Sequence, residues 1–165
     1  MASNYLDKAK ETLELIYPYI KDARLLKDFD YAIRMANALY DLHLTVHSGC
    51  SRVAICGRTF VIKVDYDKDN VREIGGCLKE YNFYNKIKDT DVAKILCPID
   101  RIKMPARYYY IMPRASQIGE HYSHEFTRVQ RKCAEKYGLA DLHRGNLGVY
   151  KKHLVIIDYA YRFKG

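Results

Sequence analysis

The sequence is short of several features that mark particular protein classes. It has no tryptophan, only four prolines among 165 residues, and no stretch rich in Pro, Gly or Ser that would separate two domains. No apolar run approaches the roughly 18 residues that a membrane-spanning helix needs. The N-terminus carries charges at Asp7, Lys8 and Lys10, which does not fit a signal peptide. We therefore expect a cytoplasmic protein without a membrane partner.

Cysteine is present but is not arranged for a structural role. There are five cysteines, an odd number, and no two of them have CxxC spacing: Cys50, Cys56, Cys77, Cys97 and Cys133. A disulfide framework or a structural zinc site is therefore not favoured. Reduced thiols in a cytosolic protein fit the pattern better.

The chain is basic, with a net charge of +8, but it contains no long Lys/Arg run. The charge favours anionic partners: nucleotides, phosphates, nucleic acid or an acidic protein surface. Because the basic residues are scattered, nucleic acid is not the preferred partner.

The hydrophobic pattern changes period along the chain and predicts an α+β fold. Residues 4–43 repeat apolar positions at steps of three and four, which predicts two or three short helices with a bend or break at Pro18. The later patterns predict strands over 43–48, 51–56, 59–66, 95–103, 107–112, 147–150 and 153–158, helices over 77–88 and 123–137, and a loop over 139–146. Cys56, Gly57 and Arg58 are expected to form a hairpin turn.

Two charged residues stand out in the middle of the chain. Lys63 lies within the apolar strand TFVIKVDY, and Glu80 lies on the helix CLKEYNFYNKI that follows it. Each alone is more simply a solvent-facing charge, on an edge strand or on a helix surface. Together they can form an ion pair that holds a Lys ammonium where it meets phosphate oxygens.

A second polar group lies near the end of the sequence. ADLHRGN contains Asp141 and Asn146, and the apolar strand LVIID ends in Asp158. An Asn and an Asp at adjoining loop and strand ends can share a hard cation such as Mg²⁺. Asp141 is then placed to orient or deprotonate a hydroxyl.

The order of these residues resembles the protein kinase-like family, and the wording of ADLHRGN is closest to its aminoglycoside phosphotransferase and atypical kinase branch. The resemblance implies a kinase-like N-lobe of antiparallel sheet plus helix over a minimal domain 44–165, a truncated C-lobe, and an N-terminal helical extension over 1–43. It also implies ATP and Mg²⁺ as cofactors. The implied nucleotide-binding residues are Gly49, Cys50, Ser51, Arg52, Val53, Lys63 and Met112; the catalytic residues are Asp141, Lys63 and Glu80; the metal ligands are Asn146 and Asp158.

The sequence departs from the family pattern at several points. The phosphate-covering turn has one Gly, Leu139 stands where a His is usual, and Ala160 replaces the Gly of a D-F-G. Only five residues follow Ala160, so the helices of 4–43 or a second subunit would have to supply part of the missing lobe. This compact form resembles small kinase-like proteins of bacteriophages, which would act on partners in the host cytoplasm.

Three functions remain open from the sequence. The first is an active phosphotransferase, a Ser/Thr protein kinase or autokinase, with a protein as acceptor. The second is a pseudokinase that binds and inhibits a protein partner without transferring phosphate. The third is a basic nucleic-acid-binding domain in which the kinase motifs arise by chance.

Overall fold

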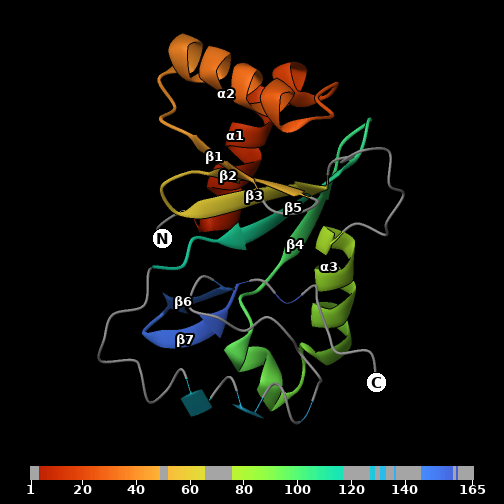
Figure 1. Cartoon of the computed structure of the whole chain (residues 1–165), viewed down its shortest axis with the longest axis vertical. Helices are drawn as coiled ribbons and strands as arrows, with labels where there is room; N and C mark the ends of the chain where they lie inside the picture. The colour runs from red at the N-terminus through yellow and green to blue at the C-terminus, as the bar shows by residue number, and fades with distance from the viewer. Residues whose placement is uncertain are drawn as a thin grey trace. The chain divides into compact units, whose positions relative to one another are not determined.

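The chain folds as an α+β protein, which confirms the expected fold class at that level; the elements whose bounds the structure describes include a five-stranded antiparallel sheet and three α-helices. The computed structural model describes residues 4–48, 52–65, 76–116, 127–128, 131–132, 136, 146–157 and 159 (Figure 1). The chain forms two compact units: Met1–Tyr81 with Ile99–Arg114, and Asn82–Pro98 with Ala115–Gly165.

Two helices open the chain, α1 over Tyr5–Ile20 and α2 over Leu26–Tyr40. Asn4 caps the start of α1 by accepting a hydrogen bond from the backbone N–H of Asp7. Asp28 accepts bonds from the backbone N–H groups of Arg24 and Leu25 at the start of α2. The expected break does not fall at Pro18, because α1 continues through it to Ile20; only the last turn of the helix follows the proline.

Five strands of the first unit form one antiparallel sheet in the order β1-β2-β3-β5-β4. Their bounds are β1 Thr45–Ser48, β2 Arg52–Cys56, β3 Phe60–Asp65, β4 Asp100–Lys103 and β5 Tyr108–Pro113. The first three strands and β5 confirm the expected positions within two residues at each end.

The turn between β2 and β3 lies where the sequence predicts it. The N–H of Gly57 donates to the carbonyl of Phe60 at 2.9 Å, which closes the hairpin. The Phe60 ring covers Gly57 so closely that an added Cβ would collide with it. Glycine is needed here for close approach rather than for an unusual backbone angle.

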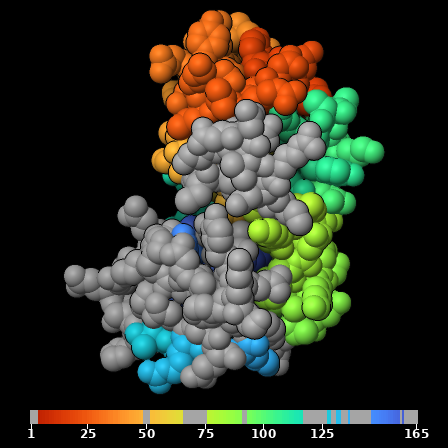
Figure 2. Space-filling view, turned by 45° about the vertical axis from the view of Figure 1, so that its right-hand side comes forward, coloured from red at the N-terminus to blue at the C-terminus, as the bar shows by residue number. Residues whose placement is uncertain are grey.

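The main core lies between α1, α2 and one face of the sheet (Figure 1). Apolar side chains at three- and four-residue steps on the helices meet alternate residues of the strands. The core residues are Ala9, Leu13, Ile16, Ile20, Ala23, Phe29, Ala32, Ile33, Ala36, Leu44, Val53, Ile55, Phe60, Ile62, Val64, Tyr109 and Ile111. In the space-filling view the two helices form the outer surface of this part of the chain, coloured red to orange (Figure 2).

The strand expected over 95–103 is shorter than its apolar pattern suggests. Asp91–Ile95 is a 3₁₀ helix, and β4 begins only at Asp100. Leu96 instead makes a parallel bridge with Ile156, and the N–H of Cys97 donates to the carbonyl of Ile156. Pro98 lacks an N–H and separates the two pairings, which explains the difference.

Helix α3, Gly76–Ile87, begins in the first unit and ends in the second. The second unit also contains a hairpin of β6 Leu147–Tyr150 and β7 His153–Ile156. Its turn residues Lys151 and Lys152 have φ angles of 51° and 65°. Strand β7 ends two residues before the expected end at 158.

Two further expectations fall mostly on residues outside the description. Of the helix expected over 123–137, the described positions are helical: Thr127, Arg128, Arg131, Lys132 and Lys136. The loop expected over 139–146 lies outside the described residues except for Asn146. Among the described residues, no helix combines the length and apolar character that a membrane crossing requires.

Candidate functional site

The face of the sheet opposite the main core carries the charged residues that the sequence singles out. Side chains alternate between the two faces of a strand, and directly paired residues of neighbouring strands share a face. Arg52 pairs with Asp65, and Lys63 lies between Ala54 on one side and Tyr110 on the other. This face therefore gathers Arg52, Lys63 and Asp65 on two adjacent strands.

Asp65 connects the end of β3 to the start of α3. Its Oδ1 accepts a hydrogen bond of 2.9 Å from the backbone N–H of Cys77, in the first turn of the helix. Such a bond satisfies one of the N–H groups that a helix leaves unpaired at its N-terminus. The carboxylate also suits the positive end of the helix dipole. Asp65 thus helps to determine where α3 begins and which of its residues face the sheet.

Glu80, on the same helix, contacts two cations through one carboxylate oxygen. Its Oε1 lies 3.2 Å from Nζ of Lys63 and 2.5 Å from Nη1 of Arg52. The Glu80 side chain is completely buried, and the side chains of Lys63 and Arg52 are 11% and 10% exposed. We call Arg52, Lys63 and Glu80 the charge cluster. The ion pair expected between the strand Lys and the helix Glu is present, with Arg52 added to it.

Burial decides how such a group contributes to stability. A carboxylate taken out of water is costly unless cations and hydrogen bonds replace its hydration. Removing one partner from a buried ion pair leaves an uncompensated charge and typically costs about 3–5 kcal/mol. Glu80 therefore depends on the two cations beside it.

The thiol of Cys77 lies at the same end of α3 and is fully buried. Burial raises the pKa of this thiol well above its usual value, and the carboxylate of Asp65 raises it further. The thiol therefore stays protonated at neutral pH, where it is a poor nucleophile and a poor metal ligand. The chemistry of the site belongs to its charged groups and not to this cysteine.

Aromatic side chains pack α3 against the sheet beside Lys63. The ring of Tyr81, next to Glu80, makes an edge contact with Tyr110, with ring centroids 5.8 Å apart. The guanidinium of Arg101 lies 4.5 Å from the centroid of the Tyr81 ring and 4.1 Å from that of Tyr108. Burial raises the pKa of Tyr110 above its usual value, so its hydroxyl stays neutral beside the charge cluster.

Two of the expected nucleotide-binding residues lie on opposite faces of the sheet. Met112 pairs with Val61, two residues from Lys63, and is on the face of the charge cluster. Val53 pairs with Val64, and its side chain is buried in the core under α1 and α2. The structure therefore brings Met112 near Lys63 but does not bring the Val53 side chain there.

The second unit contains Asn146, one of the two expected metal ligands. The carbonyl of Asn146 accepts a hydrogen bond of 2.8 Å from the N–H of Ile157, which continues the β6–β7 pairing by one step. Asp158, bonded directly to Ile157, lies outside the described residues. Tyr159 is buried; its hydroxyl donates to the carbonyl of Cys97 at 2.9 Å.

Several expected site residues cannot be placed. Gly49, Cys50, Ser51, Asp141 and Asp158 all lie outside the described residues. The described strands that precede and follow residues 49–51, β1 and β2, pair antiparallel with Ser48 opposite Val53. Within the described ranges, no three His, Cys, Asp or Glu side chains gather closely enough to hold a metal ion.

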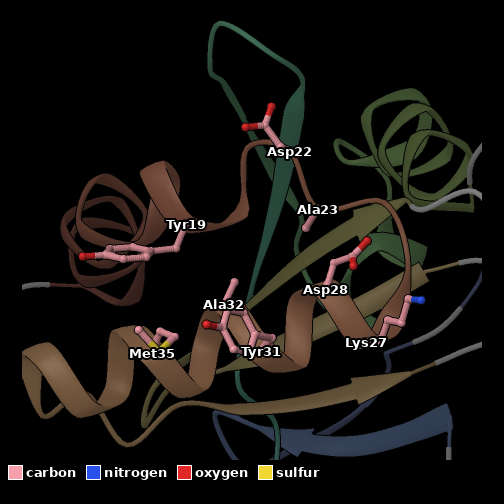
Figure 3. Close-up of a pocket in the computed structure, with 8 residues that line it drawn as sticks. All are labelled: Tyr19, Asp22, Ala23, Lys27, Asp28, Tyr31, Ala32 and Met35. Carbon is pink, nitrogen blue, oxygen red and sulfur yellow. The ribbon is translucent and has the colours of Figure 1, made fainter.

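The helical layer contains a hollow (Figure 3). It has a volume of about 540 Å³, and its lining residues lie between Tyr19 at the end of α1 and Met35 of α2. Tyr19, Tyr31 and Met35 give it an apolar lining, and Asp22 lies at its edge (Figure 3). None of the residues expected from the sequence lines it. The helices that form it cover the sheet face opposite Lys63, so they do not take the place of a second lobe over the charge cluster.

Sequence reasoning missed two features of the site. It did not anticipate that Arg52 binds Glu80, or that Asp65 caps α3. Both residues share the strand parity of Lys63 once β2 and β3 are paired, with Arg52 directly opposite Asp65. That register places Arg52 and Asp65 on the same face as Lys63, but it does not show which residues of α3 they contact.

Comparisons with known proteins identify no family for the chain. No protein-family model matches the chain, and no curated protein matches it significantly.

Proposed function

We propose that this chain is an ATP-dependent phosphotransferase whose sheet and α3 correspond to a kinase-like N-lobe. The observation that carries the proposal is the buried contact between Lys63 of β3 and Glu80 of α3, at 3.2 Å. In protein kinases a strand Lys paired with a helix Glu contacts the nucleotide phosphates. Placing a Lys in a buried strand is costly, so the position of Lys63 in a charged cluster supports a role in anion binding.

The remaining roles follow from the order of residues in the sequence. Lys63 would contact the nucleotide phosphates and Glu80 would orient it. Asn146 and Asp158 offer the oxygen ligands that Mg²⁺ prefers, and the metal would offset the charge of the phosphates. The backbone N–H of Ile157, the residue before Asp158 in the sequence, donates to the carbonyl of Asn146.

The proposed reaction transfers the terminal phosphoryl group of ATP to a hydroxyl. The bond between the terminal phosphorus and its bridging oxygen breaks, and a bond from the acceptor oxygen to phosphorus forms. ADP leaves with the bridging oxygen, and Asp141 accepts the proton of the acceptor hydroxyl. We propose a protein Ser or Thr as acceptor, on a host protein or on the chain itself.

The test is incubation with γ-labelled ATP and Mg²⁺, with and without a bacterial lysate. Wild type is compared with Asp141→Asn, Asp158→Ala and Lys63→Met, and with Lys103→Met as the control, because Lys103 is an exposed Lys of the same sheet. We expect label on protein with wild type and Lys103→Met only. Mass spectrometry of the labelled proteins then identifies the acceptor hydroxyl.

Three results would contradict the proposal. Label that persists in Asp141→Asn and Asp158→Ala would assign the transfer to a contaminant. No label, combined with a rise in melting temperature on adding ATP, would indicate a pseudokinase that binds nucleotide and acts through partners. Binding of DNA or RNA that weakens steeply with salt, without any effect of ATP, would instead favour the nucleic-acid-binding function.

A further inference from the structure

The charge cluster contains one cation more than a simple Lys–Glu pair. Arg52 and Lys63 both contact Oε1 of Glu80, and the Arg52 contact is the shorter, at 2.5 Å against 3.2 Å. A guanidinium is always charged, whereas a Lys ammonium is a compact charge on a flexible stem. The two cations are therefore suited to different tasks.

A buried Glu that depends on one Lys restricts what that Lys can do. If Lys63 were the sole partner, turning its ammonium toward a phosphate would leave the buried carboxylate of Glu80 without compensation. Because Arg52 also contacts Oε1, Lys63 can move toward an anion while Glu80 keeps a cation.

A second contact secures α3 independently of Lys63. Asp65, which pairs with Arg52 across β2 and β3, accepts the N–H of Cys77 at 2.9 Å. Cys77 and Glu80 are three residues apart on α3 and so lie on the same side of the helix. Two neighbouring positions of the sheet, Arg52 and Asp65, thus hold one side of the first turns of α3.

We propose that Arg52 is a positioning residue that holds Glu80 and the start of α3, and thereby frees Lys63 to bind the phosphates of a nucleotide. The part concerning nucleotide rests on the proposed function. The part concerning Glu80 and α3 does not, and it is tested without any ligand. The phosphate contact expected for Arg52 from the sequence is replaced in this proposal by its contact with Glu80.

The first arm of the test measures urea unfolding of the full chain without nucleotide. Arg52→Met should raise the unfolding constant at least about tenfold more than Lys63→Met, because only the former removes the closer partner of Glu80. Arg52→Lys should recover part of the loss. Arg34→Met, on the exposed side of α2, is the matched control and should have little effect. Equal or greater destabilisation by Lys63→Met overturns the proposal.

The second arm measures binding of Mg²⁺-ATP by calorimetry and includes the double variant Arg52→Met/Glu80→Gln. In Arg52→Met, Lys63 is the cation of the charge cluster that remains beside Glu80, so the affinity for ATP should fall. The double variant removes the carboxylate that retains Lys63, so it should fold and bind ATP more tightly than Arg52→Met alone. If Arg52 had a purely structural role, the double variant would not recover affinity for ATP.

The outcomes separate this proposal from the proposed function. If the double variant binds ATP no better than Arg52→Met, the release of Lys63 by Arg52 is wrong. If Arg52→Met does not fold, the comparison is made between the double variant and Glu80→Gln, which should bind ATP alike if Arg52 acts only through Glu80. If wild type does not bind ATP, the proposed function and the ligand part both fail, and the unfolding arm alone decides whether Arg52 holds Glu80.

Discussion

Replacing Tyr109 with Phe should stabilise the protein. Tyr109 lies on β5, on the core face of the sheet, and is completely buried. Its ring makes an edge contact with the ring of Tyr17, with centroids 6.1 Å apart. Its hydroxyl is buried and has no hydrogen-bond partner in the described part of the chain. A buried hydroxyl without a partner costs about 1–3 kcal/mol, so its removal should raise the free energy of unfolding by about 1 kcal/mol at neutral pH.

The gain from Tyr109→Phe should grow at alkaline pH. Burial raises the pKa of Tyr109 from 10.0 to about 12. Below pH 10 the hydroxyl is protonated in the folded and unfolded states alike. Between pH 10 and pH 12 the unfolded state loses its proton first, so the wild type loses stability as the pH rises through this range. The Phe variant lacks this proton, so its advantage over wild type in the free energy of unfolding should increase by about 2–3 kcal/mol between pH 10 and pH 12.

The assay is urea unfolding followed by circular dichroism at pH 7, 9 and 11. Tyr17→Phe is the matched control, because the hydroxyl of Tyr17 accepts a hydrogen bond of 3.0 Å from the N–H of Ala106. That variant loses the bond and should be destabilised by about 0.5–1.5 kcal/mol. The reasoning is refuted if Tyr109→Phe is less stable than wild type at pH 7, or if its advantage is the same at pH 11 as at pH 7.

Two further predictions concern the backbone connections. Asn37→Ala should lower the free energy of unfolding by about 2 kcal/mol, because the Asn37 amide bonds both the N–H and the carbonyl of Leu44 where α2 leads into β1. The measurement is urea unfolding, with Asn82→Ala at an exposed position as the control. Equal destabilisation by the two variants would contradict this prediction. Lys152→Gly should stabilise by about 0.5–1 kcal/mol, because residue 152 has a φ of 65°, which glycine adopts without strain. A loss of stability in Lys152→Gly by differential scanning calorimetry would show that this turn is not strained.

The expected strands and helices were read from local periodicity, and most of them are present. The exception at 95–99 shows the limit of that signal. Leu96 and Cys97 are apolar whether they pair with β4 and β5 or with Ile156, and periodicity does not say which. The break at Pro18 was misplaced for a related reason, because a proline near a helix end removes few bonds and the tertiary packing of Ile20 extends the helix past it.

The candidate site was predictable where one residue type is costly in its place. A Lys within an apolar strand needs a partner, and Glu80 is the acidic residue of the next helix, α3. The contribution of Arg52 was not predictable in the same way, because an Arg at the start of a strand is ordinary on a protein surface. Its role depends on the register of β2 against β3 and on the side of α3 that faces them, and both are tertiary facts.

The charge of the chain is divided unequally between its N-terminal helices and the rest, and this division bears on the proposed binding of ATP. Residues 1–43 contain six Lys or Arg and seven Asp or Glu, so the other residues carry the whole positive excess, with 22 basic and 13 acidic residues. The nearly neutral helices α1 and α2 bury one face of the sheet, while the opposite face carries Lys63 and Arg52. A polyanion such as ATP is attracted by the basic part of the chain, and the field weakens with added salt. Since the buried cations of the charge cluster are screened less than surface lysines, ATP held by Lys63 should resist added salt far better than ATP held on the surface.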